Sequence, residues 1–415
     1  MVAPKLRFKE FDGDWTESKL KDCIDSIDSG WSPQCESHPA DENEWAVLKT
    51  TSVDWDGFKA NFNKKLPSNL EARFEIEVKP NDILVTRAGP TERVGVVAVV
   101  PHNVRSRLMI SDKLIRLKAN NENNPEFLGI SLSSVKCQNQ LQSKTSGLAK
   151  SQTNISQKIL SDVSLITPSK PEQTKIASFL SAVDQKISQL TQKHELLSQY
   201  KQGMMQKLFS QQIRFKADDG SEFGEWEKRK VSDLFIEIKE KVLNQNIETY
   251  SITAGKGFVS QAEKFGRNIS GMQNSNYIVL QPNDFSYNKG NSKTFKYGCV
   301  YLNEFDHPIA VPNVFISFRA KVTKSIYEKF YAHLFENHYL DRRLRLLISS
   351  SARMDGLLNV SKEGFFEIKL PSPCLEEQTE IANFLSAIDQ KIEIVAQQIE
   401  QAKQWKKGLL QQMFV

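Results

Sequence analysis

The sequence has little cysteine and nothing that resembles an export or membrane segment. Its five cysteines are scattered, and no Cys-x-x-Cys motif occurs. This pattern argues against a disulfide framework or a structural zinc site and favours a reducing cytosol. The start of the chain lacks the basic and then apolar pattern of a signal peptide, and no window approaches the length of apolar sequence that spans a membrane. We therefore expect a cytoplasmic protein with no membrane partner.

The motifs of several enzyme classes are missing as well. There is no Gly-x-x-x-x-Gly-Lys-Ser/Thr loop for ATP and no His-Glu-x-x-His pair for zinc. An Asn/Asp-Pro-Pro-aromatic tetrapeptide and a Gly-rich fingerprint after a strand are also missing, so methyl transfer has no visible site. We predict no catalytic residue, no metal site and no cofactor bound by this chain itself.

Two weaker hints of chemistry are interpreted as structural. His333 and His338 are five residues apart, which is out of phase for one helical face, and we expect both at the surface. The nearest approach to a nuclease site is a group of four charged residues within one alternating segment, whose only clear counterpart in the second half is Asp284: Glu75, Glu77, Lys79 and Asp82.

The overall charge does not by itself indicate a nucleic-acid partner. The net charge is only +5 over 415 residues, and 25% of the residues are charged, as in ordinary globular proteins. The length exceeds that of one typical domain and predicts two to four.

The most informative feature is an internal repeat. The segment PEQTKIASFLSAVDQKI at 171–187 returns as EEQTEIANFLSAIDQKI at 376–392. Residues 172–209 and 377–414 are identical at 20 of 38 positions without a gap. Shorter matches occur upstream of these repeated segments. Trp15 corresponds to Trp226, and the Pro-Asn-Asp sequence at 80–82 corresponds to the one at 282–284. The residues between, 25–150 and 236–350, are otherwise unlike each other, so two similar frames enclose two different bodies.

Within each repeated segment the apolar residues alternate at spacings of four and three for about five heptads, which favours a coiled coil over a helix packed only on its own domain. Lys201 and Lys406 occupy equivalent seam positions, where we expect their ammonium groups to reach solvent. The predicted seam residues are Ile176, Leu180, Val183, Ile187, Leu190 and Leu197 in the first copy, and Ile381, Leu385, Ile388, Ile392, Val395 and Ile399 in the second.

Each body is predicted to be an α+β domain. Strand-like segments at 74–89, 93–101, 249–260, 276–290 and 310–318 are rich in β-branched residues and interrupted by Gly, Pro and Asn, and 325–349 is helical in pattern.

Polar loops follow the two Pro-Asn-Asp segments, and Arg87 and Lys289 hold the same repeat position in them. Arg can read guanine, Asn can read adenine, and Lys or Ser can hold phosphates. The alternative is a tight turn with solvated side chains. A second pair of loops precedes the repeated helices. The candidate DNA-binding residues are Arg87, Arg93, Lys144 and Lys150 in the first body, and Asn288, Lys289, Asn291, Ser292, Lys293 and Arg353 in the second.

The doubled motif, EQTKIASFL at 172–180 and EQTEIANFL at 377–385, resembles that of the specificity (S) subunit of type I restriction–modification systems, over essentially the whole chain. The resemblance implies that each body reads one half of a split, asymmetric site on double-stranded DNA. It also implies partners: two methyltransferase (M) subunits, which bind S-adenosylmethionine, and restriction/translocase (R) subunits, which use ATP and Mg. The missing catalytic motifs are expected in that setting.

We thus predict an α+β chain with two pseudo-two-fold-related α/β target-recognition domains, separated by two long antiparallel coiled-coil helices. The expected boundaries are a first recognition domain at 1–167, a central helix at 168–211, a second recognition domain at 212–372 and a C-terminal helix at 373–415. Two other functions remain open at this point: a self-sufficient DNA nuclease and a coiled-coil scaffold that binds proteins only.

Overall fold

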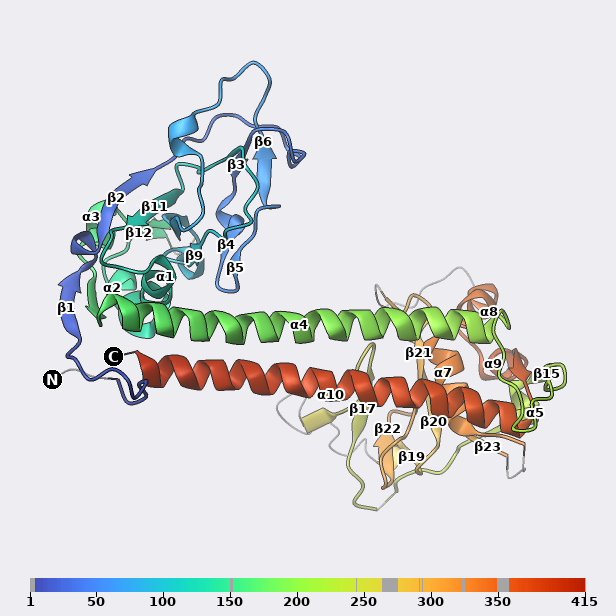
Figure 1. Cartoon of the computed structure of the whole chain (residues 1–415). Coiled ribbons are helices and arrows are strands. Elements are labelled where there is room, and N and C mark those ends of the chain that lie inside the picture. The colour runs from blue at the N-terminus through green and yellow to red at the C-terminus, as the bar shows by residue number, and fades with distance from the viewer. Residues whose placement is uncertain are drawn as a thin grey trace. The chain divides into compact units, whose positions relative to one another are not determined.

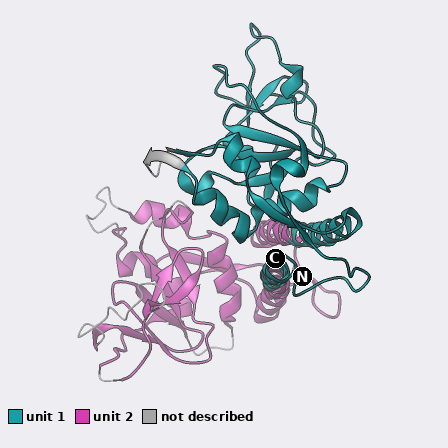
Figure 2. Cartoon of the chain, turned by 90° about the vertical axis from the view of Figure 1, so that its left-hand side faces the viewer, with its two compact units in different colours: residues 1–190, 397–415 teal, residues 191–396 magenta. Residues whose placement is uncertain are grey.

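The computed structural model describes residues 4–149, 152–243, 245–262, 275–290, 292, 294–321, 325–348 and 358–414. The chain divides into two compact units, one made of residues 1–190 and 397–415 and the other of residues 191–396 (Figure 2). Each unit combines a mixed body with one part of each of two long helices. No helix among the described residues is both long enough and apolar enough to cross a membrane.

Unit 1 is built on a four-stranded antiparallel sheet with the strand order β2-β11-β7-β9. Alternate residues of its central strands enter different cores, as the two-residue period of a strand requires. Ile83 and Val85 pack with the helices α1 and α2, whereas Leu84 packs with the smaller sheet β10-β3-β6.

The strands of unit 1 are β1 (Thr16–Lys19), β2 (Ile24–Ser29), β3 (Ala46–Leu48), β4 (Val53–Asp54), β5 (Gly57–Phe58), β6 (Asn63–Lys65), β7 (Ile83–Thr86), β8 (Ala88–Gly89), β9 (Val97–Val99), β10 (Leu108–Met109), β11 (Leu114–Ala119), β12 (Ser146–Ala149), β13 (Gln152–Asn154) and β14 (Ser164–Thr167). Its short helices are α1 (Pro125–Ser133), α2 (Val135–Gln142) and α3 (Gln157–Ser161), and its 3-10 turns are Leu20–Asp22, Thr50–Ser52, Phe74–Ile76 and Thr91–Arg93.

Unit 2 repeats this arrangement with different residues. Its main sheet has the order β16-β23-β20-β21, which matches β2-β11-β7-β9 strand for strand, and β15 pairs with β24 as β1 pairs with β14. Figure 1 labels β20, β21 and β23 of this sheet. Its core is far more aromatic than that of unit 1, with Phe235, Phe285, Phe318 and Phe330 fully buried.

The strands of unit 2 are β15 (Glu227–Lys230), β16 (Phe235–Glu237), β17 (Tyr250–Thr253), β18 (Gly257–Ser260), β19 (Ile278–Leu280), β20 (Phe285–Asn288), β21 (Cys299–Leu302), β22 (Ile309–Val311), β23 (Ile316–Ala320) and β24 (Lys369–Ser372). Its short helices are α5 (Val231–Leu234), α7 (Glu328–Glu336), α8 (Asp341–Leu347) and α9 (Lys362–Phe366).

The repeated Pro-Asn-Asp sequence forms the same turn in both units. Asn81 and Asn283 have positive φ angles of 71° and 69°, a region that asparagine tolerates better than most residues. The carboxylates of Asp82 and Asp284 accept the backbone N–H three residues earlier, at 2.8 and 2.7 Å. The turn therefore sets the start of β7 and of β20, from which the candidate loops follow.

The two long helices are α4 (Lys170–Phe209) and α10 (Leu375–Met413). In unit 1, Ile176 and Leu180 near the start of α4 share an apolar cluster with Met413 near the end of α10. In unit 2, Leu208 near the end of α4 shares a cluster with Ile381 near the start of α10. The helices thus pair antiparallel within each unit. The predicted seam residues are buried or half-buried throughout.

Three predictions about local structure were wrong. The segment 74–89 is not one strand, because a 3-10 turn and the Pro-Asn-Asp turn precede β7. The segment 325–349 forms two helices rather than one, and the break includes His338, whose φ of 56° is incompatible with a continuing helix. His333, expected at the surface, is only 7% exposed.

Candidate nucleic-acid interface

The glutamate of the repeated motif ties the start of each unit to its long helix. In unit 1 the fully buried carboxylate of Glu172 accepts two hydrogen bonds from Arg7, from Nε and Nη2, both at 2.7 Å. The indole Nε1 of Trp15 donates a third at 3.2 Å. Such a bidentate pair fixes geometry as well as adding stability.

Unit 2 repeats this lock residue for residue. Glu377 accepts from Nε of Arg214 at 2.9 Å, from its Nη2 at 2.7 Å and from the indole of Trp226 at 2.8 Å. The carboxylate is completely buried, so its charge depends on the arginine for compensation. The repeated Glu, Arg and Trp are therefore one structural device used twice.

The glutamine of the motif fastens each body to the same helix start. The side-chain carbonyl of Gln173 accepts the backbone N–H of Asn124, and that of Gln378 accepts the backbone N–H of Tyr327, both at 2.9 Å. Each amide group also donates to the carbonyl of the proline five residues earlier. Asn124 and Tyr327 immediately precede α1 and α7, so the first body helix of each unit is placed from the long helix.

The loop after β7 carries Arg87 between two neighbouring segments. Its backbone N–H donates to the carbonyl of Lys113 at 2.8 Å, and its own carbonyl accepts from Ile155 at 3.0 Å. The side chain is half-buried, and no ion pair of this arginine is seen within the described part of the chain. A cation held at its backbone with a free guanidinium is suited to bind an external acceptor.

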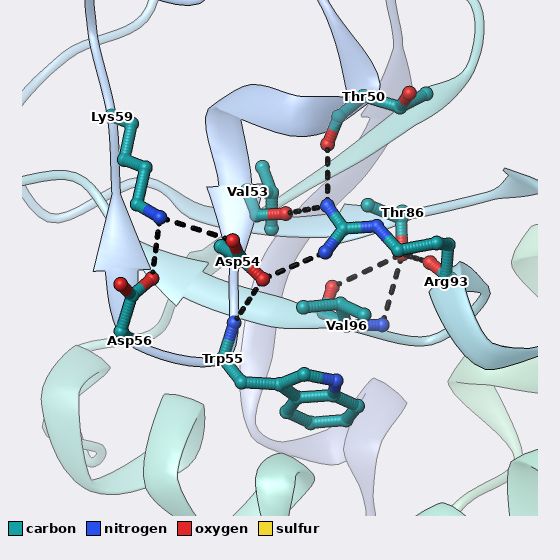
Figure 3. A network of polar contacts seen from close by, with 9 residues as sticks. All are labelled: Thr50, Val53, Asp54, Trp55, Asp56, Lys59, Thr86, Arg93 and Val96. Carbon is teal, nitrogen blue, oxygen red and sulfur yellow. Dashed lines mark hydrogen bonds and ion pairs between the residues drawn. The ribbon is translucent and has the colours of Figure 1, made fainter. Parts of the chain in front are cut away.

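Unlike Arg87, Arg93 has a guanidinium that is bound by neighbouring residues of the same unit (Figure 3). Its guanidinium donates to the carboxylate of Asp54 and to the carbonyl of Val53, both at 2.7 Å. Hydrogen bonds from Lys59 and then from Arg93 lower the pKa of Asp54 to about 2. This network braces the β4–β5 hairpin and leaves the guanidinium engaged with the chain itself. The surroundings of Arg93 give no support to a DNA contact.

In unit 2 the corresponding loop is only partly described. The amide of Asn288 donates to the carbonyl of Ile252 at 3.2 Å and accepts the backbone N–H of Gly290, so this side chain shapes the loop. Lys289 is half-buried and directly follows β20, as Arg87 directly follows β7. Its carbonyl accepts from Leu358, two residues before the repeat counterpart of Ile155. The two residues therefore hold the same structural position, as the repeat predicts.

The remaining candidate DNA-binding residues are either exposed or lie outside the described residues. Ser292 is exposed, and its hydroxyl accepts the backbone N–H of Phe295 at 3.0 Å. Lys144 is exposed just after α2. Four candidates lie outside the described residues: Lys150, Asn291, Lys293 and Arg353.

A polar cluster around the buried side chains of Lys201 and His333 in unit 2 was not foreseen. The ammonium group of Lys201, on α4, lies 2.7 Å from Glu336 of α7 and 2.6 Å from Asp389 of α10. The imidazole of His333 contacts Glu336 at 3.3 Å and the hydroxyl of Ser386 at 3.1 Å. Lys201 is 7% exposed, so the expectation that it reaches solvent was wrong.

This cluster contains the ligand types of a metal site but also its own cation. His333, Glu336 and Asp389 converge within 4.8 Å. The lysine already supplies the positive charge that these carboxylates need. Burial would raise the pKa of Glu336, but the hydrogen bond from His333 and the charge of Lys201 outweigh it and lower the pKa. We therefore interpret the cluster as an ion-pair network that joins α7 to both long helices.

Three of the four nuclease-like residues of unit 1 are occupied by structural contacts. Glu77 accepts the backbone N–H of Arg107 at 2.7 Å and pairs with Lys79. Asp82 caps its turn and lies 3.6 Å from the buried guanidinium of Arg116, and burial raises its pKa. The carboxylates of Glu77 and Asp82 are thus committed to the fold, whereas the side chain of Glu75 is exposed.

Comparison with protein families agrees with the duplicated architecture. The model of the type I restriction modification DNA specificity domain matches the chain twice, at residues 13–199 and 224–404. The two matches coincide with the two copies of the body and helix.

Individual relatives are more distant. The chain is 38% identical over 182 residues to the type I restriction enzyme EcoEI specificity subunit of Escherichia coli, a match that covers 42% of this chain and 30% of that subunit. It is 24% identical over 421 residues to the putative type I restriction enzyme MjaX specificity subunit of Methanocaldococcus jannaschii, which covers 98% of this chain and 94% of that protein.

The fold is similar to that of a solved structure, the S subunit of a type I restriction-modification system from M. genitalium. The TM-score is 0.61 at 16% identity, and the match covers 100% of this chain and 99% of that one. At this identity the likeness concerns the fold alone.

Proposed function

Because the chain belongs to the type I restriction–modification DNA specificity family, we propose that it is the DNA-reading subunit of such a complex. Its first recognition domain, 1–167, and its second, 212–372, each read one half of a bipartite site on double-stranded DNA. The helical segments 168–211 and 373–415 set the spacer and dock two methyltransferase subunits. Those partners supply S-adenosylmethionine binding, and restriction/translocase subunits supply the ATP- and Mg-dependent steps.

The observation that carries the proposal is the identical anchoring of two different bodies. The Glu-Arg-Trp lock and the Gln contact recur in both units. The loops that follow β7 and β20 start from the same turn and yet carry Arg87 in one unit and Lys289 in the other. Two domains that recognise two different half-sites need the same attachment to the helices but different loops. This is the combination that the two units have.

The test is the sequence that the assembled complex methylates. Methylome sequencing of cells that carry this chain with its methyltransferase partner should return one bipartite, asymmetric motif. A continuous motif, or none, would contradict the proposal.

The spacer can be tested in the same experiment. Four residues inserted after Gln192, within α4, lengthen the helix by about 6 Å. At about 3.4 Å per base pair, the spacer should grow by one or two base pairs with both half-sites unchanged. A fully active complex with the original spacer would show that the helices do not set the gap.

A further inference from the structure

One arginine of unit 1 is held ready for a ligand by an aromatic ring. The guanidinium of Arg73 lies over the indole of Trp31, 4.1 Å from its centroid. Arg73 is exposed, and within the described residues its guanidinium has no carboxylate partner. An arginine stacked in this way loses conformational freedom but keeps its planar set of N–H donors free, which suits recognition of a planar acceptor pair.

The backbone fixes this stacked pair beside the loop that leads into β11. Trp31 donates its N–H to the carbonyl of Ile110 at 3.1 Å, and the N–H of Arg73 contacts the sulfur of Met109 at 3.3 Å. Gly30 packs so closely on Ile110 that a Cβ would lie 1.8 Å from its carbonyl oxygen. The glycine is therefore needed for the tryptophan to reach this place.

The same loop carries two further polar side chains and continues to the Arg87 position. Asp112 and Lys113 are exposed. The hydroxyl of Ser32 accepts the backbone N–H of Asp112 at 3.2 Å and donates to one oxygen of its carboxylate, which fixes this side chain. The carbonyl of Lys113 accepts the backbone N–H of Arg87 at 2.8 Å. Contacts with residues 109–113 thus connect the three residues: Arg73 through Met109, Trp31 through Ile110 and Arg87 through Lys113. We refer to this set of connected residues as the edge.

We propose that this edge, made of Trp31, Arg73, Arg87, Asp112 and Lys113, contacts the DNA half-site read by unit 1. Arginine suits guanine, an aspartate accepts from cytosine, and lysine suits guanine or phosphate. The mixture of signs favours base reading over unspecific attraction. This inference rests on the proposed function and adds Arg73, Asp112 and Lys113 to the predicted contacts.

The corresponding loop of unit 2 lacks the charged residues of this edge. The loop between β22 and β23 corresponds to the loop between β10 and β11 in the matched sheets. It reads Pro-Asn-Val-Phe at 312–315, with Val314 49% exposed, so it offers neither the aspartate nor the lysine. Two loops at one position with different chemistry should select different bases.

The experiment compares point variants of the full chain, assembled with its methyltransferase partner, in binding and methylation of the motif. Arg73→Ala and Lys113→Ala should weaken binding by about 5- to 150-fold for a base contact, and relax one half of the motif. Arg87→Ala should affect that same half, and Lys289→Ala the other. Arg73→Lys, which keeps the charge but loses the planar donors, should rescue affinity more than selectivity.

Lys158→Ala, on the exposed side of α3, is the matched control and should bind as the wild type does. Equal thermal unfolding midpoints show that the variants fold. Wild-type affinity and motif in Arg73→Ala and Lys113→Ala would overturn the inference while leaving the proposed function intact. A wild-type complex without any sequence preference would instead overturn the proposed function, and the inference with it.

Discussion

The two units share one frame but hold their bodies to the long helices by different chemistry. In unit 2, α7 presents His333 and Glu336 to a buried lysine, Lys201. In unit 1 the matching helix α1, nine residues long like α7, has Ile130 and Ser133 at these positions.

The seam lysine of unit 1 is accordingly less enclosed. Lys406 pairs with Asp184 at 2.6 Å, and its side chain is 30% exposed against 9% for Lys201. Ile130, Ser133 and Lys406 line a cavity of about 990 Å³. The comparison teaches that the repeated lock at Glu172 and Glu377 is the shared means of attachment, whereas the polar cluster is an addition of unit 2.

The shared lock should give the largest effects, and equal ones in both units. Glu377→Gln leaves Arg214 without its buried carboxylate and should destabilise unit 2 by about 3 kcal/mol. Glu172→Gln should do the same to unit 1. Chemical unfolding followed in each variant measures this, and a large effect in only one unit would show that the lock is not equivalent.

The polar cluster should distinguish the units. Lys201→Met removes the cation between two carboxylates and should cost about 1–2 kcal/mol, because Glu336 and Asp389 are then left facing each other. The cost is moderate because solvent screens the two carboxylates, which are 50% and 41% exposed. Lys406→Met breaks one half-exposed pair and should cost less than about 1 kcal/mol. Equal losses in the two variants would show that the two seam lysines contribute alike to their units.

Acid should affect unit 2 through the same cluster. The folded pKa of Glu336 lies below its ordinary value of 4.5, so its contribution to stability is complete above that pH. The contribution is lost as the pH falls through the folded pKa, because the protonated acid no longer pairs with Lys201. Glu336→Gln should therefore flatten the fall of the unfolding midpoint below pH 4.5. An unchanged acid slope in this variant would refute the assignment.

The repeat allowed much of this to be predicted from the sequence. The heptads identified the long helices, and the gapless match between the two copies identified both bodies. The Pro-Asn-Asp match identified the equivalence of Arg87 and Lys289. The partners of the glutamate were also within reach, because Arg7 and Arg214 stand in similar segments, LRFK and IRFK.

The polar cluster could not be predicted in this way. Lys201 and Glu336 are 135 residues apart, and only the fold brings them together. Neither has a repeat partner with the same surroundings, so the offset gives no signal. The same holds for Trp31 and Arg73, whose stacking depends on a close approach of backbone at Gly30. A tertiary contact that occurs in only one of the two units leaves no repeated pattern in the sequence, so it cannot be predicted from the repeat.

The central claim is that the two bodies recognise their half-sites independently while they share one helical frame. The most direct test of this claim is an exchange of bodies. Residues 25–150 would be replaced by the corresponding body of a relative, with Glu172, Gln173 and both long helices kept. Methylome sequencing of cells that carry the hybrid and its methyltransferase partner should show one half-site changed, with the other half-site and the spacer as before. A change in both half-sites would contradict the account.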